Sequence, residues 1–205
     1  MKIAGVFHET SEGVHPSEVL FYNDLMKLGV KCLLTFALSV LISACIKQKN
    51  DALLLATFTE NDVEVSIRLE ANTDGNHFLL ATFIPPNGHH LYSKDIPLTG
   101  VEGLGRPTLL ELSANSQMRS LGGLLECVPS EIPDFEPMEL LVYPAGIVTL
   151  SLPVQLPPGN EWVDETVKVT YMSCSGNGCK APVVGKLIPI RVPGAGMSIM
   201  GDENE

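Results

Sequence analysis

The clearest pattern in this chain is an alternation of polar and apolar residues over 62–69, DVEVSIRL. It places four apolar side chains on one face, namely Val63, Val65, Ile67 and Leu69. This period of two is typical of a half-buried β-strand. Further short apolar runs, separated by turn residues, occupy 78–84, 108–112, 140–143, 147–154, 166–173 and 187–192. Seven or eight short strands at this spacing predict an all-β fold, a two-sheet sandwich that is immunoglobulin-like in size.

The longest apolar run has a different character. It covers 33–44 and follows Lys27 and Lys31. About a dozen residues are too short to cross ~30 Å of hydrocarbon as a helix. A basic n-region, a short apolar h-region and small residues at the cleavage site are typical of a secretory signal peptide. The segment at that site, ISAC over 42–45, resembles the lipobox of bacterial lipoproteins. In that family the cysteine, here Cys45, receives a diacylglycerol and becomes the new N-terminus.

These patterns divide the chain. We expect a mis-annotated extension over 1–25, a lipoprotein signal peptide over 26–44 and a lipidated tether over 45–52. The sandwich would then cover 53–194 and a flexible tail 195–205. The alternative for the apolar run is a buried core helix after a genuine N-terminal segment. A signal and a lipid anchor predict a periplasmic or cell-envelope protein held on a membrane, where disulfides persist.

The composition of the chain excludes some classes of function. The 205 residues carry a formal net charge of −11, which argues against a nucleic-acid partner because phosphate contacts need a basic face. The 45% of hydrophobic residues suffices for a packed core. The chain has no nucleophile-elbow, zinc-protease, P-loop or dinucleotide-binding motif, and we expect no cofactor.

Cys174 and Cys179 bracket SGNG, at the end of one predicted strand and ahead of another. A four-residue connection with two glycines can close a hairpin and bring the cysteines within bonding distance. A loop this short gains little stability from a cross-link. Spacing alone leaves three possibilities open, namely an inert hairpin disulfide, a redox-active exposed pair or a metal site. Cys127 lies in an apolar context, and we expect its thiol to be buried and inert.

The metal alternative would be copper, which accepts imidazole and thioether ligands. The candidate ligands are His77, His89, His90, Met172, Met197 and Met200.

Three segments together resemble one known family. They are VTYMSCSGNGCKAP over 169–182, NGHHLYSKDI over 87–96, and VYPAG leading to LPV between 142 and 154. Each resembles a stretch of the N-terminal periplasmic domain of the thiol:disulfide interchange protein DsbD, and they occur in the family's order.

The resemblance implies an immunoglobulin-like sandwich in which Cys174 and Cys179 face each other across two strands. It implies a dithiol that receives electrons from a thioredoxin-like domain, or a membrane electron-transfer protein, and passes them to oxidised periplasmic proteins. Tyr92 matches a tyrosine beside the family's disulfide, and His90 stands where the family usually has another. The best match to the family's cap loop is Asp134-Phe135-Glu136, with Phe135 as the cap; an ordinary core aromatic is the alternative.

The chain also departs from the family. Four residues separate the cysteines where the best-known members have five, and KAP replaces an aromatic followed by prolines. We expect the reductant to be a separate molecule. The leading hypothesis is extracytoplasmic thiol–disulfide exchange through Cys174 and Cys179. The rival is a non-catalytic binding or adaptor lipoprotein that keeps the disulfide as a staple.

Overall fold

A computed structural model of the chain describes residues 52–197, and its regular elements there are all β-strands. They are β1 (Leu53–Glu60), β2 (Val63–Ala71), β3 (His77–Ile84), β4 (His90–Leu91), β5 (Leu109–Leu112), β6 (Arg119–Ser120), β7 (Leu125–Glu126), β8 (Val148–Gln155), β9 (Trp162–Tyr171), β10 (Ser173–Ser175), β11 (Gly178–Cys179) and β12 (Val183–Pro193). Across 52–197 there is no helix long and apolar enough to span a bilayer. The predicted extension, signal peptide and lipidated Cys45 lie outside the described residues.

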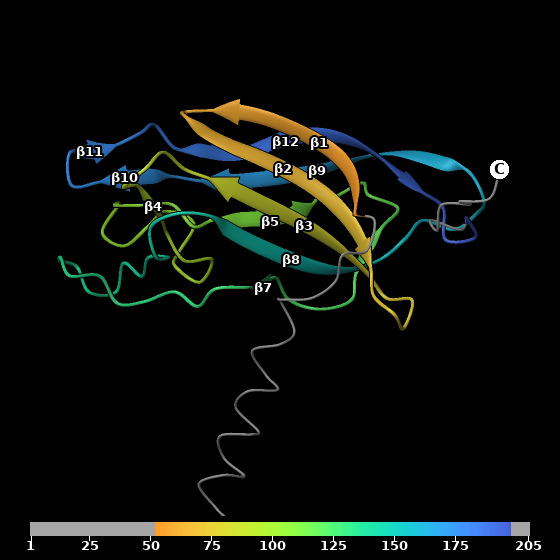
Figure 1. Cartoon of the computed structure of the whole chain (residues 1–205), viewed down its shortest axis with the longest axis horizontal. Helices are drawn as coiled ribbons and strands as arrows, with labels where there is room; N and C mark the ends of the chain where they lie inside the picture. Colours follow the sequence, from red (N-terminus) through yellow and green to blue (C-terminus); the bar gives the residue numbers. More distant parts are fainter. Residues whose placement is uncertain (1–51, 198–205) are drawn as a thin grey trace, which may run out of the picture. The chain divides into compact units, whose positions relative to one another are not determined.

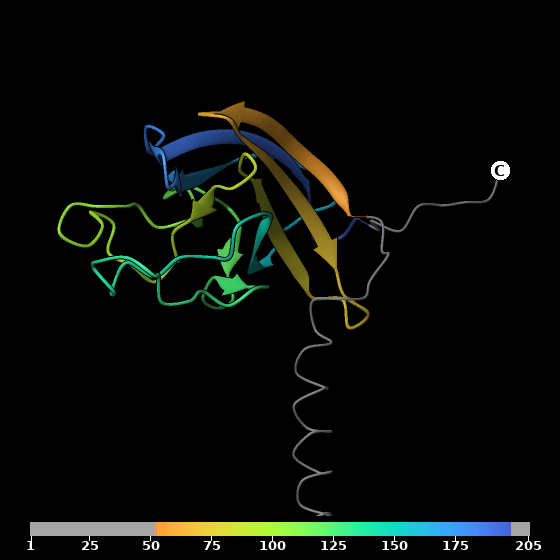
Figure 2. The same ribbon diagram turned by 60° about the vertical axis from the view of Figure 1, so that its left-hand side comes forward.

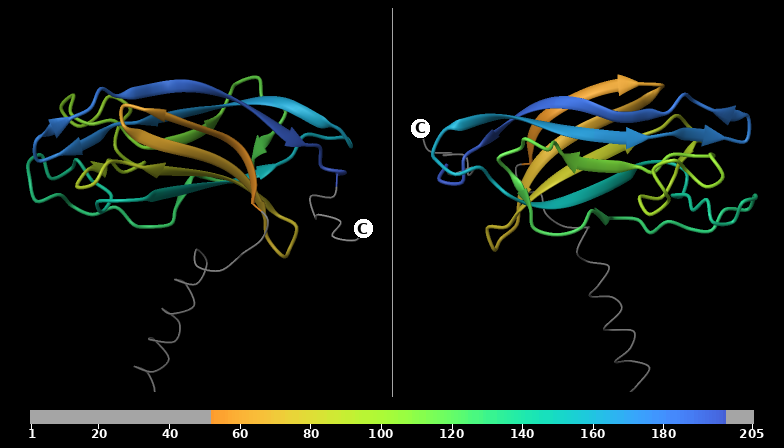
Figure 3. Two further views of the ribbon diagram at one scale, coloured as in Figure 1. Left: turned by 45° about the horizontal axis from the view of Figure 1, so that its top comes forward. Right: turned by 180° about the vertical axis from the view of Figure 1, so that it is seen from behind.

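Two main sheets face each other (Figure 1). One has the strand order β1-β2-β3-β8-β6, with β7 also paired to β8, and the other has the order β12-β9-β5. Seen from behind, β9, β12 and β5 form the nearer layer (Figure 3). Buried side chains from both sheets form one apolar cluster between the layers. The prediction of an all-β, immunoglobulin-like two-sheet sandwich is confirmed.

The alternating segment over 62–69 forms most of β2, an interior strand of the larger sheet. Its four apolar side chains are at most 1% exposed, whereas Glu64 and Arg68 between them point outward. β2 pairs antiparallel with β1 on one side and with β3 on the other. The predicted face therefore lies in the core, as period-two alternation requires when one side of a sheet is buried.

β1 is a strand that the sequence pattern did not reveal. It lies at the edge of the larger sheet, and its residues alternate between exposed and half-buried rather than fully buried. A register shift between Leu54 and Ala56 also interrupts its pairing with β2. An edge strand with an irregularity loses the strict alternation that marks a half-buried strand.

The predicted strand over 140–143 is wrong. This segment forms only isolated bridges, from Val142 to Tyr92 and to Glu131. Its apolar side chains are nevertheless buried in a smaller cluster with Tyr92, Ile96 and Cys174. The apolar run therefore predicted the burial of these side chains correctly, although not a strand. Pro137 and Pro144 flank it, and because proline lacks an N–H, continuous ladder pairing is limited on both sides.

A third, small sheet has the order β11-β10-β4. It lies at one end of the sandwich, where the long loops after β4 and after β7 also gather (Figure 2). Proteins commonly carry binding and reactive groups on loops at the end of a rigid sandwich. This end holds both cysteines of the predicted site.

Two smaller expectations need adjustment. Cys127 is half-buried rather than buried, and its N–H donates to the carbonyl of Thr149 on β8. The described start of the predicted tail is tied to the domain, since the Ala195 N–H donates to the Pro157 carbonyl and the Gly196 N–H to the Gly159 carbonyl. The rest of the predicted tail lies outside the described residues.

Candidate functional site

A disulfide joins Cys174 on β10 to Cys179 on β11. The two residues are direct partners in the antiparallel pair, and Ser175 faces Gly178 one step closer to the turn. Gly178 has φ of +127°, a conformation that favours glycine. The glycines noted in the sequence thus allow the tight hairpin that places the sulfurs together.

The two halves of the disulfide differ in exposure. Cys174 is 2% exposed and belongs to the small apolar cluster at this end of the sandwich. Cys179 lies on the short outer strand β11 and is exposed. A reagent in solution therefore meets Cys179, whereas Cys174 is covered by protein.

Tyr92 lies against the disulfide from the other side of β10. Its hydroxyl donates a hydrogen bond to Sγ of Cys174 at 3.0 Å and lies 3.9 Å from Sγ of Cys179. Burial raises the pKa of the Tyr92 phenol, so the group remains a proton donor at neutral pH. Tyr92 can therefore stabilise negative charge on the buried sulfur.

β4 places a histidine directly opposite Cys174, in register with the two cysteines. His90 is the direct partner of Cys174, which is in turn the direct partner of Cys179. Residues directly opposite each other in neighbouring strands project to the same face of a sheet. The order across this sheet is thus imidazole, buried cysteine, exposed cysteine.

Phe135 covers the histidine. The two rings are stacked with centroids 5.8 Å apart, and the His90 ring also meets Tyr92 edge-on at 5.4 Å. Phe135 remains 37% exposed, so it lies on the surface as a cover rather than in the core. The segment identified from sequence as the cap therefore lies over the neighbours of the disulfide.

The electrostatics around His90 favour its neutral form. Burial lowers its pKa, the nearby His89 lowers it further, and the exposed Asp134 carboxylate opposes both. Nε2 of His90 is buried and has no hydrogen-bond partner among the described residues. Of the four predicted neighbours, Tyr92 contacts the disulfide and His90 lies opposite Cys174, whereas Phe135 and the charge of Asp134 act on His90.

Sequence reasoning missed the residues that hold Tyr92 in place. Gly105 has φ of +74°, and a Cβ there would lie 2.7 Å from Leu140 Cδ1 and 3.2 Å from Tyr92 Cδ1. The Tyr92 carbonyl accepts hydrogen bonds from both the N–H and the hydroxyl of the buried Thr108. No local pattern marks these positions, because they meet Tyr92 only through tertiary folding.

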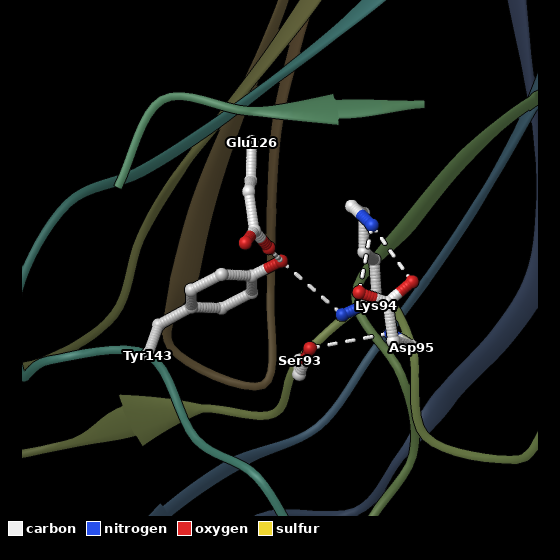
Figure 4. A network of polar contacts seen from close by, with 5 residues as sticks. All are labelled: Ser93, Lys94, Asp95, Glu126 and Tyr143. Atoms are coloured by element: carbon white, nitrogen blue, oxygen red, sulfur yellow. Dashed lines mark hydrogen bonds and ion pairs between the residues drawn. The ribbon is translucent and has the colours of Figure 1, made fainter. Parts of the chain in front are cut away.

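A second missed group is a polar network beneath the segment that follows Tyr92 (Figure 4). The hydroxyl of Tyr143, a fully buried residue, donates to the Glu126 carboxylate at 2.8 Å and accepts from the Lys94 N–H at 3.2 Å. The Ser93 hydroxyl accepts from the Asp95 N–H. Because burial and the Glu126 charge raise the pKa of Tyr143 far above its ordinary range, this donor stays intact.

The turn between β1 and β2 touches the chain just beyond Cys179. Asn61 and Asp62 form this turn, both with positive φ, as in a type I′ hairpin. The Asn61 side-chain amide donates to the Ala181 carbonyl, and the Asp62 carboxylate pairs with Nζ of Lys180 at 2.5 Å. Lys180, the residue after Cys179, is therefore held by an ion pair.

For a metal, the described residues offer no group of three or more His, Cys, Asp and Glu side chains close enough to hold an ion. His89 instead bonds to the hydroxyl of Ser173 through Nδ1 at 3.0 Å. His77 lies at the start of β3, on another strand of the sandwich.

Comparisons with known proteins add a structural likeness. No family model matches the chain, and no curated protein matches its sequence. Among solved structures, the N-terminal domain of DsbD from Neisseria meningitidis, in its reduced form, is similar. The similarity has a TM-score of 0.37 and 12% sequence identity, and covers 73% of this chain and 90% of that one.

Proposed function

We propose that this protein catalyses thiol–disulfide exchange through Cys174 and Cys179. The observation that supports this proposal best is that the two cysteines of the disulfide differ in exposure. One sulfur belongs to an exposed residue on an outer strand, and the other is buried under a tyrosine hydroxyl that donates to it. An exchange reaction needs an accessible sulfur to attack and a leaving sulfur whose negative charge is stabilised.

The asymmetry in exposure supports a different role for each sulfur. A thiolate of the reducing partner attacks Sγ of Cys179, a new disulfide forms between them, and the Cys174–Cys179 bond breaks. The electron pair goes to the Cys174 sulfur, where the Tyr92 hydroxyl stabilises the thiolate. The partner's second thiol then attacks the mixed disulfide, which releases Cys179 as a thiolate and leaves the partner oxidised. The reduced pair repeats these steps in reverse on an oxidised protein.

The partners we propose follow from the sequence resemblance over 169–182. The electron donor is a thioredoxin-like domain or a membrane electron-transfer protein, and the acceptors are oxidised envelope proteins. The signal pattern and Cys45 support a lipid-anchored position in the periplasm or cell envelope. A Cys45→Ser variant should leave the membrane fraction of producing cells, and retention of that variant in the membrane would reject the anchor.

The direct test is the reduction potential of the Cys174–Cys179 pair, equilibrated against glutathione or dithiothreitol. Exchange-active pairs have potentials of roughly −180 to −270 mV, whereas structural disulfides of secreted proteins lie below about −300 mV. A value in the first range, with rapid reduction by a thioredoxin-like donor, supports exchange. A lower value, or no reaction without denaturant, rejects it and leaves a stapled binding domain.

A trapping experiment tests the roles of the two sulfurs. Cys174→Ser keeps the accessible thiol but removes the one that resolves the mixed disulfide, so it should accumulate an adduct with a thioredoxin-like protein. Cys179→Ser is the matched control and should accumulate far less, because Cys174 is buried. Equal trapping by the two variants would contradict the assignment.

A further inference from the structure

Within 52–197, one ring nitrogen of His90 lacks a hydrogen-bond partner. Its Nε2 atom is buried and makes no hydrogen bond among the described residues. A buried polar atom left unsatisfied costs free energy, and such an atom in a folded protein calls for a physical reason. The neighbouring strand supplies one, because the residue directly opposite His90 is Cys174.

The oxidised disulfide offers His90 no proton. When the pair is reduced, the buried Cys174 gains an S–H group, and opposed residues on adjacent strands have Cβ atoms about 4.5–5.5 Å apart. The Tyr92 hydroxyl already donates to Sγ of Cys174, so it can stabilise a thiolate but is not the acceptor of its proton. The half-buried imidazole of His90, with its buried Nε2 atom, is the basic group placed opposite this thiol.

We propose that His90 accepts the proton of the Cys174 thiol in the step that re-forms the disulfide. The inference rests on the proposed exchange function. In this step the exposed Cys179 is bonded to the oxidised partner. Cys174 passes its proton to Nε2 of His90, and its thiolate attacks Sγ of Cys179. The Cys174–Cys179 bond forms, the Cys179–partner bond breaks, and the partner leaves as a thiolate that carries the electron pair.

The surroundings of His90 fit this role. Phe135 stacks on one face of the ring, the Nε2 atom is buried, and partial burial of the ring lowers the His90 pKa, so His90 is neutral and able to accept. The titratable groups facing it are Tyr92, which stays protonated, the neighbouring His89, and Asp134, whose carboxylate favours the imidazolium that forms. The imidazolium and the Cys174 thiolate would also stabilise each other as an ion pair.

The test isolates the resolving step. In the full chain with Cys32, Cys45 and Cys127 replaced by serine, the reduced protein reacts briefly with excess glutathione disulfide, which forms the glutathione adduct at Cys179 and releases glutathione, and acid then halts the exchange. A jump to pH 6–9 then starts resolution, and mass spectrometry follows conversion of the adduct to the internal disulfide. The variants are His90→Phe, which keeps an aromatic ring under Phe135, and His90→Gln, which keeps a polar side chain without a basic nitrogen.

The native rate should be nearly flat between pH 7 and 8, because His90 is neutral throughout. Without the base, both variants should be slower by about 10²-fold at pH 7. Their rates should rise roughly tenfold per pH unit up to about pH 8.5, where the thiol ionises unaided. His77→Gln is the matched control, a half-buried histidine whose pKa is also lowered by burial, and it should keep the native profile.

The outcomes separate the two proposals. If native protein and His90 variants resolve the adduct at the same rate with the same pH profile, the role of His90 is overturned while exchange stands. If native protein neither forms nor resolves the adduct, the exchange function itself fails and this role with it. Loss of the flat region in either His90 variant, with folding verified by its circular dichroism spectrum, supports the proton transfer.

Discussion

The hydroxyl of Tyr92 donates a hydrogen bond to Sγ of Cys174 at 3.0 Å, although the two residues are 82 positions apart in sequence. The bond exists because β4 pairs with β10 and places the residues next to each other at one end of the sandwich. It is the only side-chain hydrogen bond to the buried sulfur among the described residues. The chemistry of the disulfide should therefore depend on this phenol.

The Tyr92→Phe substitution should raise the pKa of the Cys174 thiol. A hydrogen bond to a charged group contributes about 1.5–3 kcal/mol, and 1.36 kcal/mol corresponds to one pKa unit, so we expect a rise of about one to two units. The measurement is thiolate absorbance against pH in a Cys179→Ser background. Tyr171→Phe removes a hydroxyl that donates to the Glu60 carbonyl instead, and should leave the thiol pKa in place. An unchanged pKa in Tyr92→Phe would contradict the role of the phenol.

Removal of the Phe135 ring from His90 should loosen the packing beside the disulfide and speed its reduction by small thiols. An aromatic pair contributes about 0.5–1.5 kcal/mol, so Phe135→Ala should speed reduction by dithiothreitol roughly twofold to tenfold. Stopped-flow or quenched-flow kinetics under native conditions would measure it. Ile132→Ala changes a side chain that is 67% exposed in the same segment, and it should reduce at the native rate. If both variants behave alike, Phe135 does not act as a cap.

The polar network under the Tyr92 segment should contribute to stability. Tyr143→Phe leaves the half-buried Glu126 carboxylate without its donor and the Lys94 N–H without its acceptor. We expect a loss of about 1–3 kcal/mol in the free energy of unfolding, measured by denaturant titration. Tyr171→Phe, whose hydroxyl serves one neutral carbonyl, should cost less. A Tyr143→Phe variant as stable as the Tyr171→Phe control would show that the network contributes little.

The ion pair beyond Cys179 gives a pH-dependent contact. The hydrogen bond and charge of Lys180 lower the pKa of Asp62, so the ionised form is the one stabilised by folding. Its contribution is complete above the unfolded-state pKa of about 3.9 and is lost as pH falls through the lower folded-state pKa. In Lys180→Gln, the Asp62 pKa should return to about 3.9 in an NMR titration. A pKa that stays depressed would mean that another group holds this carboxylate.

Part of this architecture could be predicted from local sequence. The alternation around Val63 and Val65 predicted a half-buried strand, because a sheet with one face in the core forces a period of two. The spacing of Cys174 and Cys179 around two glycines predicted residues close enough to bond, since a tight hairpin needs little more than its own turn residues. Both features depend on residues that are neighbours along the chain.

The rest required the tertiary structure. β1 lacked a strict period of two because its core-facing side chains are only half-buried and its pairing with β2 shifts register between Leu54 and Ala56. The segment 140–143 had an apolar pattern but forms only isolated bridges. The stacking of Phe135 on His90 and the burial of Cys174 beside an exposed Cys179 depend on how distant segments meet at one end of the sandwich. The sequence by itself thus determined the buried face of β2 and the proximity of the two cysteines. Tertiary packing alone decided which sulfur is accessible and which groups surround it, because burial and side-chain contacts arise between segments far apart in the chain.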